Sequence, residues 1–142
     1  MESGKYYAIE DLKRYSKLET SIECLKDKIA SINAQLEGSG INFDKISVVG
    51  GHTTIEDKYI NSISDKGHYE RMLKVNILEY RAIKRAIESL PKEEQRILKI
   101  AFIDRGRYHI ETIMSEFNVE KSRAYELKKQ ALDAYIVSMY GG

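Results

Sequence analysis

The sequence predicts an all-α protein in which a long N-terminal helical hairpin or coiled-coil pair is followed by a set of shorter helices. Its 142 residues are 42% hydrophobic and 32% charged, with one proline and no tryptophan, which is typical of soluble helices with long charged faces. Apolar residues recur every three to four positions in two long runs within residues 1–89. This spacing predicts helices, because it places the apolar side chains on one face.

The first predicted helix extends from about residue 6 to residue 37. From Leu18 onward its apolar residues are separated by alternating steps of four and three, which is the spacing of a coiled-coil seam. So narrow a seam needs a partner helix, either elsewhere in the chain or in a second copy, which would make a homodimer through the N-terminal helices. Its apolar positions are Leu12, Tyr15, Leu18, Ile22, Leu25, Ile29, Ile32 and Leu36.

A loop near residues 38–53 is predicted to follow this helix. Gly38 and Gly40 lie at its start, and glycine suits a helix end and weakens a helix interior. The second helix is predicted to start near Thr54, whose hydroxyl can cap it, and to break or bend at Gly67. Residues 71–85 carry five basic side chains against Glu79 alone, which we interpret as a solvated helix face. The predicted apolar face comprises Ile55, Tyr59, Ile60, Ile63, Leu73, Ile77, Tyr80, Ile83, Ile87 and Leu90.

Pro91 marks a boundary between a helical region, residues 1–89, and a C-terminal domain, residues 90–142. Proline is favoured in the first turn of a helix, and this helix is predicted to end near Asp104. A turn at residues 105–107 then leads into a short helix from about His109 to Phe117, with Ile110, Ile113, Met114 and Phe117 facing inward.

The sequence after this short helix predicts a tight corner between two crossing helices. Asn118 occupies the corner, where a positive φ is often required and where asparagine tolerates it well. Val119 fills the turn, and the small Ala124 lets the second helix approach closely. The predicted core face of this second helix comprises Ala124, Leu127, Ala131 and Tyr135.

The opposite face of this helix carries side chains that could bind double-stranded DNA. Arginine, serine and glutamine can donate hydrogen bonds to base edges in the major groove, whereas lysine neutralises phosphates. An amphipathic helix with a polar face is more often only a surface helix. The preceding corner and upstream helix favour the interpretation that this face binds DNA. The residues expected in the groove are Lys121, Ser122, Arg123, Glu126, Lys129 and Gln130. Those considered for phosphate contacts are Arg105, Arg107, Tyr108 and Tyr125, although ordinary packing is equally expected for the tyrosines.

The stretch LPKEEQRILKIAFIDRGRYHIETIMSEFNVEKSRAYELKKQALDAY, residues 90–135, resembles the promoter-binding fourth region of sigma factors. Shared features are the Leu-Pro start, the Ile-Leu pair, the corner ending in Val119, and an Arg-containing helix that closes with Lys-Gln-Ala-Leu. With its long helical first part, the chain looks like the phage late-gene transcriptional regulators of the ArpU and RinA type. The resemblance implies a sigma-region-4-like helix-turn-helix and sequence-specific regulation of phage or prophage late genes with host RNA polymerase.

Three residues depart from that pattern. Met114 stands where a small residue is usual, which predicts a wider crossing angle, while Glu120 and His109 occupy expected cap positions in place of better caps.

Two alternative functions remain open. A phage small terminase subunit would bind packaging-site DNA as a ring, and a helical adaptor would bind protein through the Leu18 to Leu36 seam without binding DNA.

Other chemistry has little support in the sequence. The three histidines are far apart and form no metal-binding pattern, and no nucleophile motif or cofactor-binding motif is recognised, so we expect no enzyme, metal or cofactor. Cys24 is the sole cysteine, which favours a reducing cytoplasm, and the resemblance to phage regulators implies that of a bacterial host cell. No run approaches the roughly 20 apolar residues of a membrane-spanning helix. The net charge of +1 gives no global electrostatic argument for a polyanionic partner.

Overall fold

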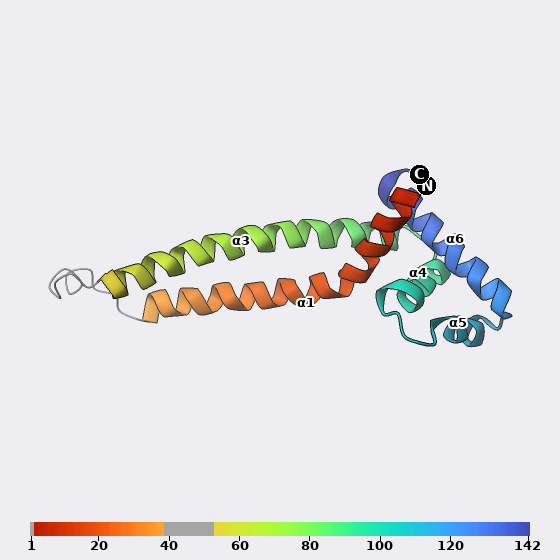
Figure 1. The fold of residues 1–142 in the computed structure, drawn as a ribbon, viewed down its shortest axis with the longest axis horizontal. Coiled ribbons are helices and arrows are strands. Elements are labelled where there is room, and N and C mark those ends of the chain that lie inside the picture. Colours follow the sequence, from red (N-terminus) through yellow and green to blue (C-terminus); the bar gives the residue numbers. More distant parts are fainter. Residues whose placement is uncertain (1, 39–52) are drawn as a thin grey trace. The chain divides into compact units, whose positions relative to one another are not determined.

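A computed structural model describes residues 2–38 and 53–142, with side chains described for residues 4–38 and 56–142. It confirms the all-α prediction, and no strand occurs in these ranges (Figure 1). The expected loop near residues 38–53 lies outside the described residues, apart from its ends. The helices are α1 (Glu2–Gly38), α3 (Thr53–Glu88), α4 (Lys92–Leu98), the π-helical turn η1 (Lys99–Ile103), α5 (His109–Phe117) and α6 (Lys121–Tyr140).

The chain forms two compact units, and both contain parts of α1 and α3. One unit comprises Met1–Glu19 with Leu78–Gly142, and the other comprises Thr20–Ile77. This division differs from the boundary expected at residues 89 and 90. The reason is that the first turns of α1 pack against α6, more than one hundred residues later in the chain, as shown by the hydrogen bond between Asp11 and Tyr135.

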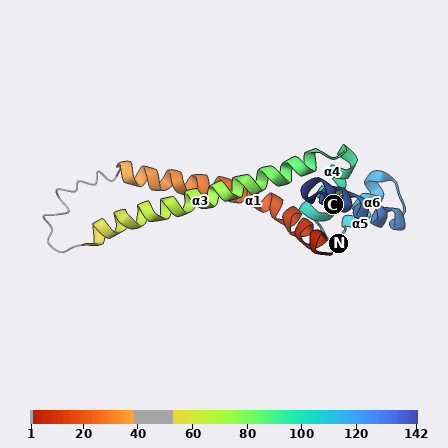
Figure 2. The same ribbon diagram turned by 90° about the horizontal axis from the view of Figure 1, so that it is seen from above.

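In the Thr20–Ile77 unit, α1 and α3 lie side by side as an antiparallel pair (Figures 1 and 2). Ile22 and Leu25 are buried, as the heptad spacing predicts. The Asn76 side-chain amide donates a hydrogen bond to Ser21 Oγ at 3.1 Å across the pair. The seam of α1 therefore packs against α3 of the same chain, which is one of the two partners that the sequence left open.

Two details of the predicted α3 are wrong. The helix continues without interruption through Gly67, because helical residues on both sides outweigh the cost of one glycine, about 1 kcal/mol relative to alanine. Ile60 and Ile63 are 54% and 47% exposed, although they were assigned to the apolar face. Ser62 and Tyr69 of α3 instead line a shallow pocket together with Ile32 of α1.

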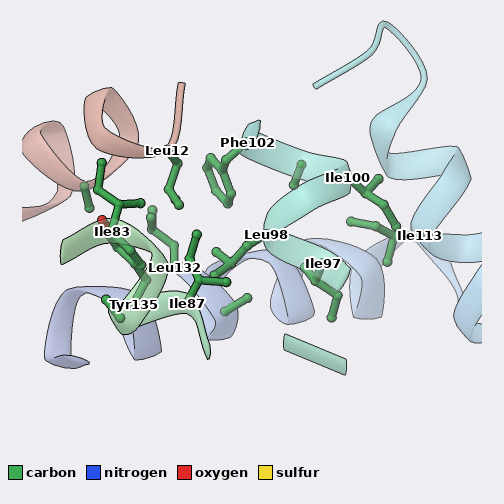
Figure 3. Packing of buried hydrophobic residues seen from close by; sticks show 14 of the residues in the cluster. Leu12, Ile83, Ile87, Ile97, Leu98, Ile100, Phe102, Ile113, Leu132 and Tyr135 are labelled. Atoms are coloured by element: carbon green, nitrogen blue, oxygen red, sulfur yellow. The ribbon is translucent and has the colours of Figure 1, made fainter. Parts of the chain in front are cut away.

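The core of the other unit joins the start of α1 to the ends of α3 and α6 (Figure 3). Ala8 and Leu12 of α1 are fully buried, as is Tyr135 of α6. The Tyr135 hydroxyl donates a hydrogen bond to the Asp11 carboxylate at 3.2 Å, and the Tyr140 hydroxyl donates a second one. Burial, together with the neighbouring Asp11 carboxylate, raises the pKa of Tyr135 far above its ordinary value, so the phenol remains a donor. These bonds attach α6 to the first turns of α1.

The helix predicted after Pro91 is present, but its second half is a π-helical turn. Pro91 lies immediately before the first helical residue, and the Gln95 backbone N–H donates to its carbonyl at 3.0 Å. In η1 the helix widens, and the Asp104 N–H donates to the Lys99 carbonyl at 2.8 Å. The buried side chains of α4 and η1 are Ile97, Leu98, Ile100, Ala101 and Phe102.

The corner between α5 and α6 has the predicted geometry. Asn118 adopts a left-handed conformation, with φ 53° and ψ 55°, and ends α5 through a hydrogen bond from its N–H to the Met114 carbonyl. The Val119 N–H donates to the same carbonyl at 3.1 Å. At the start of α6, the Ala124 N–H donates to the Glu120 carbonyl at 2.9 Å. Three residues, 118–120, therefore connect the two helices.

Asn118→Val is expected to lower the free energy of unfolding by about 1–2 kcal/mol, because a β-branched side chain is strained at positive φ. Asn118→Gly is the matched control and should stay close to the natural protein, since glycine adopts this conformation freely. Urea denaturation followed by circular dichroism measures both values. Equal stability of the valine and glycine variants would contradict the left-handed conformation.

Candidate functional site

The orientation of α6 is set by the side chains that it buries. Ala124, Ala131 and Tyr135 are fully buried and Leu132 nearly so, while Leu127 is half-buried. The prediction for Ala124, Ala131 and Tyr135 is thus confirmed, and Leu132 is an additional core residue. Helix α6 packs against α4 and α5, so its buried side cannot rotate outward without opening the core.

The outward side of α6 presents all six residues that were expected to enter a groove. Their side chains are exposed along the first ten residues of the helix. Arg123 Nη1 lies 3.0 Å from Glu126 Oε2 in an exposed pair three residues apart. Such pairs contribute only about 0.3–0.5 kcal/mol, so the guanidinium can be redirected to a ligand at little cost. The six residues are Lys121, Ser122, Arg123, Glu126, Lys129 and Gln130.

The turn before α5 presents three of the four residues considered for phosphate contacts, and the fourth, Tyr125, lies in α6. Arg105, Arg107 and Tyr108 are exposed, and the Arg107 guanidinium lies 5.6 Å from the centre of the Tyr108 ring. Tyr108, rather than His109, occupies the N-cap position of α5, because His109 is already the first helical residue, so the helix begins one residue earlier than a cap at His109 would place it. Its carbonyl accepts a hydrogen bond from the Thr112 hydroxyl at 2.9 Å.

The N-cap position of α6 is occupied by the residue that the sequence predicts, Glu120. Glu120 is the N-cap of α6 in an extended conformation, and its side chain makes no capping hydrogen bond. The first backbone N–H groups of α6 therefore receive no side-chain acceptor from this position. An anionic ligand at this end of the helix would satisfy the same groups.

A cleft of about 450 Å³ adjoins the outward side of α6. It brings Arg105, from the turn that follows η1, together with Tyr125 and Lys129 of α6. Tyr125 is 50% exposed and forms part of the wall. Sequence reasoning missed two further cations in this cleft, Lys5 of α1 and Lys128 of α6.

The spacing of Lys128 from Tyr125, one helical turn, was a usable signal, because both lie between the buried and the outward sides of α6. Lys5 had no comparable signal. It comes from the opposite end of the chain and reaches the cleft only because α1 packs against α6.

Positive charges are crowded in this part of the molecule. Partial burial lowers the pKa of Lys128, and the nearby Arg105 and Lys5 lower it further. The pKa of His109 is also lowered, first by burial and then by Lys128 and Arg105, so His109 is neutral at neutral pH. The Lys128 ammonium lies 3.1 Å from His109 Nε2, which fits a neutral imidazole accepting a hydrogen bond from the lysine.

The described residues define the class as all-α, with a three-residue corner that orients an exposed polar helix face. The chain belongs to the family described as Protein of unknown function (DUF1492), which it matches over residues 38–135. The match includes α3 to most of α6 and leaves out nearly all of α1, including Lys5 and Asp11. No curated protein and no solved structure matches the chain.

Two searches of the described residues bear on other kinds of site. No helix among them has the length and apolar character needed to cross a membrane. Within the same residues, no three or more histidine, cysteine, aspartate or glutamate side chains are grouped so that they could hold a metal ion.

Proposed function

We propose that the protein is a sequence-specific DNA-binding transcriptional regulator in which α5, the corner and α6 act as a helix-turn-helix. The observation that carries this proposal is the division of α6 into two sides. Its buried side is locked into the core through Ala124, Ala131 and Tyr135, and its outward side carries the polar residues of the first ten positions. A helix fixed in this way can enter the major groove without rearrangement of the core.

The residue types on the outward side match the chemistry of base edges. Arg123 can donate two hydrogen bonds to guanine, and Gln130 can pair with adenine in the same bidentate manner. Lys121 lies at the start of α6 and can neutralise a phosphate, as can Arg105 and Arg107 in the turn before α5. Glu126 holds Arg123 in the unbound protein and can accept a hydrogen bond from cytosine once the arginine is redirected.

The charge of the C-terminal region indicates that DNA binding needs support from a second component. Residues 90–142 contain nine basic and eight acidic side chains. Because phosphate neutralisation supplies much of the affinity for DNA, such a module binds weakly by itself. A second copy of the chain or host RNA polymerase would supply the missing affinity, in keeping with the resemblance to regulators of phage late genes.

The proposal is tested by selecting bound fragments from the parent genome and measuring their affinity by fluorescence anisotropy at several salt concentrations. Arg123→Ala is expected to weaken binding about 5- to 150-fold and to relax the base preference, since a bidentate contact contributes about 1–3 kcal/mol. Lys129→Ala is expected to weaken binding to all sequences and to reduce the salt dependence by about one counterion.

Lys13→Ala is the matched control. Lys13 is an exposed lysine on α1 that forms an ion pair with Glu10 three residues away, as Arg123 does with Glu126. Affinity and salt dependence that remain unchanged in Arg123→Ala and Lys129→Ala would overturn the assignment of this surface. A ring-sized mass with selection of a packaging site would favour the terminase alternative, and the absence of DNA binding at low salt would favour the adaptor.

A further inference from the structure

The cleft beside α6 combines a cationic rim with an apolar floor. Four cationic side chains line it, Lys5, Arg105, Lys128 and Lys129, with Asp133 as the single carboxylate. The aliphatic side chains of the lining and Phe102 are here called the floor, and they are Ile9, Phe102, Leu132 and Ile136. These residues come from α1, η1, the turn that follows η1 and α6, and all of them belong to the same compact unit.

The positive charge of the rim is poorly compensated within the protein. Neither Arg105 nor Lys128 forms an ion pair with any carboxylate in residues 4–38 and 56–142. Lys128 instead lies 5.4 Å from the centre of the Phe102 ring and 3.1 Å from a neutral histidine nitrogen. A negatively charged group in the cleft would therefore relieve repulsion that the folded chain leaves in place.

The apolar floor separates this cleft from a simple contact for a DNA phosphate. A backbone phosphate has no apolar part that could cover Ile9 and Ile136, whereas small-molecule sites combine an apolar lining with a few charged groups. The volume of about 450 Å³ lies within the usual range for such sites, roughly 300–1,000 Å³. Tyr125 and Phe102 add aromatic surface suited to a flat ligand.

We propose that this cleft binds a small organic anion, in which a phosphate, sulfonate or carboxylate is attached to an aromatic body. The acidic group lies against Lys128, Arg105 and Lys5, and the aromatic body covers the floor between Tyr125 and Ile136. Because Tyr125 and Lys129 also belong to the proposed DNA surface, an occupied cleft changes the surface that α6 offers to DNA. The binding itself does not depend on DNA and is measured without it.

The test uses three probes that separate the two parts of the ligand. Anilinonaphthalene sulfonate carries both an acidic group and an aromatic body, N-phenyl-1-naphthylamine carries the body alone, and inorganic sulfate carries the charge alone. Fluorescence titration of the full chain is expected to show saturable binding of the sulfonate at one site. Binding of the neutral amine is expected to be at least 10-fold weaker, and sulfate is expected to compete only at high concentration, because each part alone forfeits the other contact.

Lys128→Met and Arg105→Met are each expected to weaken sulfonate binding about 10-fold, since each removes one charge-assisted contact. Tyr125→Ala is expected to weaken binding of the sulfonate and the amine alike. Lys13→Met is the control, because Lys13 is an exposed lysine of α1 outside the cleft. Circular dichroism melting identifies any variant that has lost its fold, and the remaining variants decide the result. Equal affinity of the natural protein, Lys128→Met and Arg105→Met for the sulfonate, or equal binding of sulfonate and amine, would overturn the proposal.

Discussion

Tyr135→Ala is expected to lower the free energy of unfolding by about 3–5 kcal/mol, the cost of replacing a large buried aromatic side chain by alanine. Tyr135 is completely buried in α6, where it packs in the core that includes Leu12 of α1 and Ile87 of α3 (Figure 3). The variant leaves a cavity that the surrounding helices fill only in part. It also removes a hydroxyl that donates to Asp11, so the attachment of α1 to α6 is weakened at the same position. Urea denaturation measures the change.

Two further variants separate the contributions at this position. Tyr135→Phe removes only the hydroxyl and is expected to cost about 1 kcal/mol, the usual net contribution of one hydrogen bond. Tyr125→Ala lies on the same helix at an exposed position and is expected to change stability by less than about 0.5 kcal/mol. If Tyr135→Ala were as stable as Tyr125→Ala, this result would contradict the packing of Tyr135 between α6 and α1.

Ile113→Ala is expected to lower the free energy of unfolding by about 2–5 kcal/mol and to reduce DNA binding at temperatures where the variant is still folded. Ile113 is the fully buried residue of α5, and α5 packs against both η1 and α6. Removing its side chain loosens the support that holds α6 against the rest of the core. Because contact with base edges requires an accurately placed helix, the loss of affinity should exceed that expected from partial unfolding alone.

Ser115→Ala is the control for this experiment, since Ser115 is exposed on the same helix two residues later. It is expected to leave both stability and DNA affinity close to those of the natural protein. Stability and affinity are measured on the same preparations by urea denaturation and fluorescence anisotropy. A large loss of stability with unchanged DNA affinity would show that DNA binding does not require α5 to hold α6 in its orientation.

Local patterns predicted the features that depend on neighbouring residues. The heptad steps from Leu18 predicted the buried Ile22 and Leu25, because helical geometry alone brings residues three and four apart onto one side. Asn118 was predicted at positive φ because few other residues tolerate that conformation. The burial of Ala124 followed from its small size at a helix crossing.

Features that depend on distant residues could not be predicted in this way. Ile60 and Ile63 have the same hydrophobicity as buried isoleucines, and only the position of α1 leaves them exposed. The division of the chain at Glu19 and Leu78 is not marked by any loop or helix end, since it falls within two continuous helices. No glycine or proline lies at or beside either position.

The sequence by itself determined the helical class, the seam of α1, the corner at Asn118 and the polar side of α6, because each of these arises from interactions between residues close together in the chain. Only the tertiary structure decided that Asp11 accepts hydrogen bonds from Tyr135 and Tyr140, and that Lys5 joins Lys128 beside one cleft. Such contacts depend on how whole helices pack, and a periodic pattern specifies which side of a helix is buried but not which distant residue will cover it.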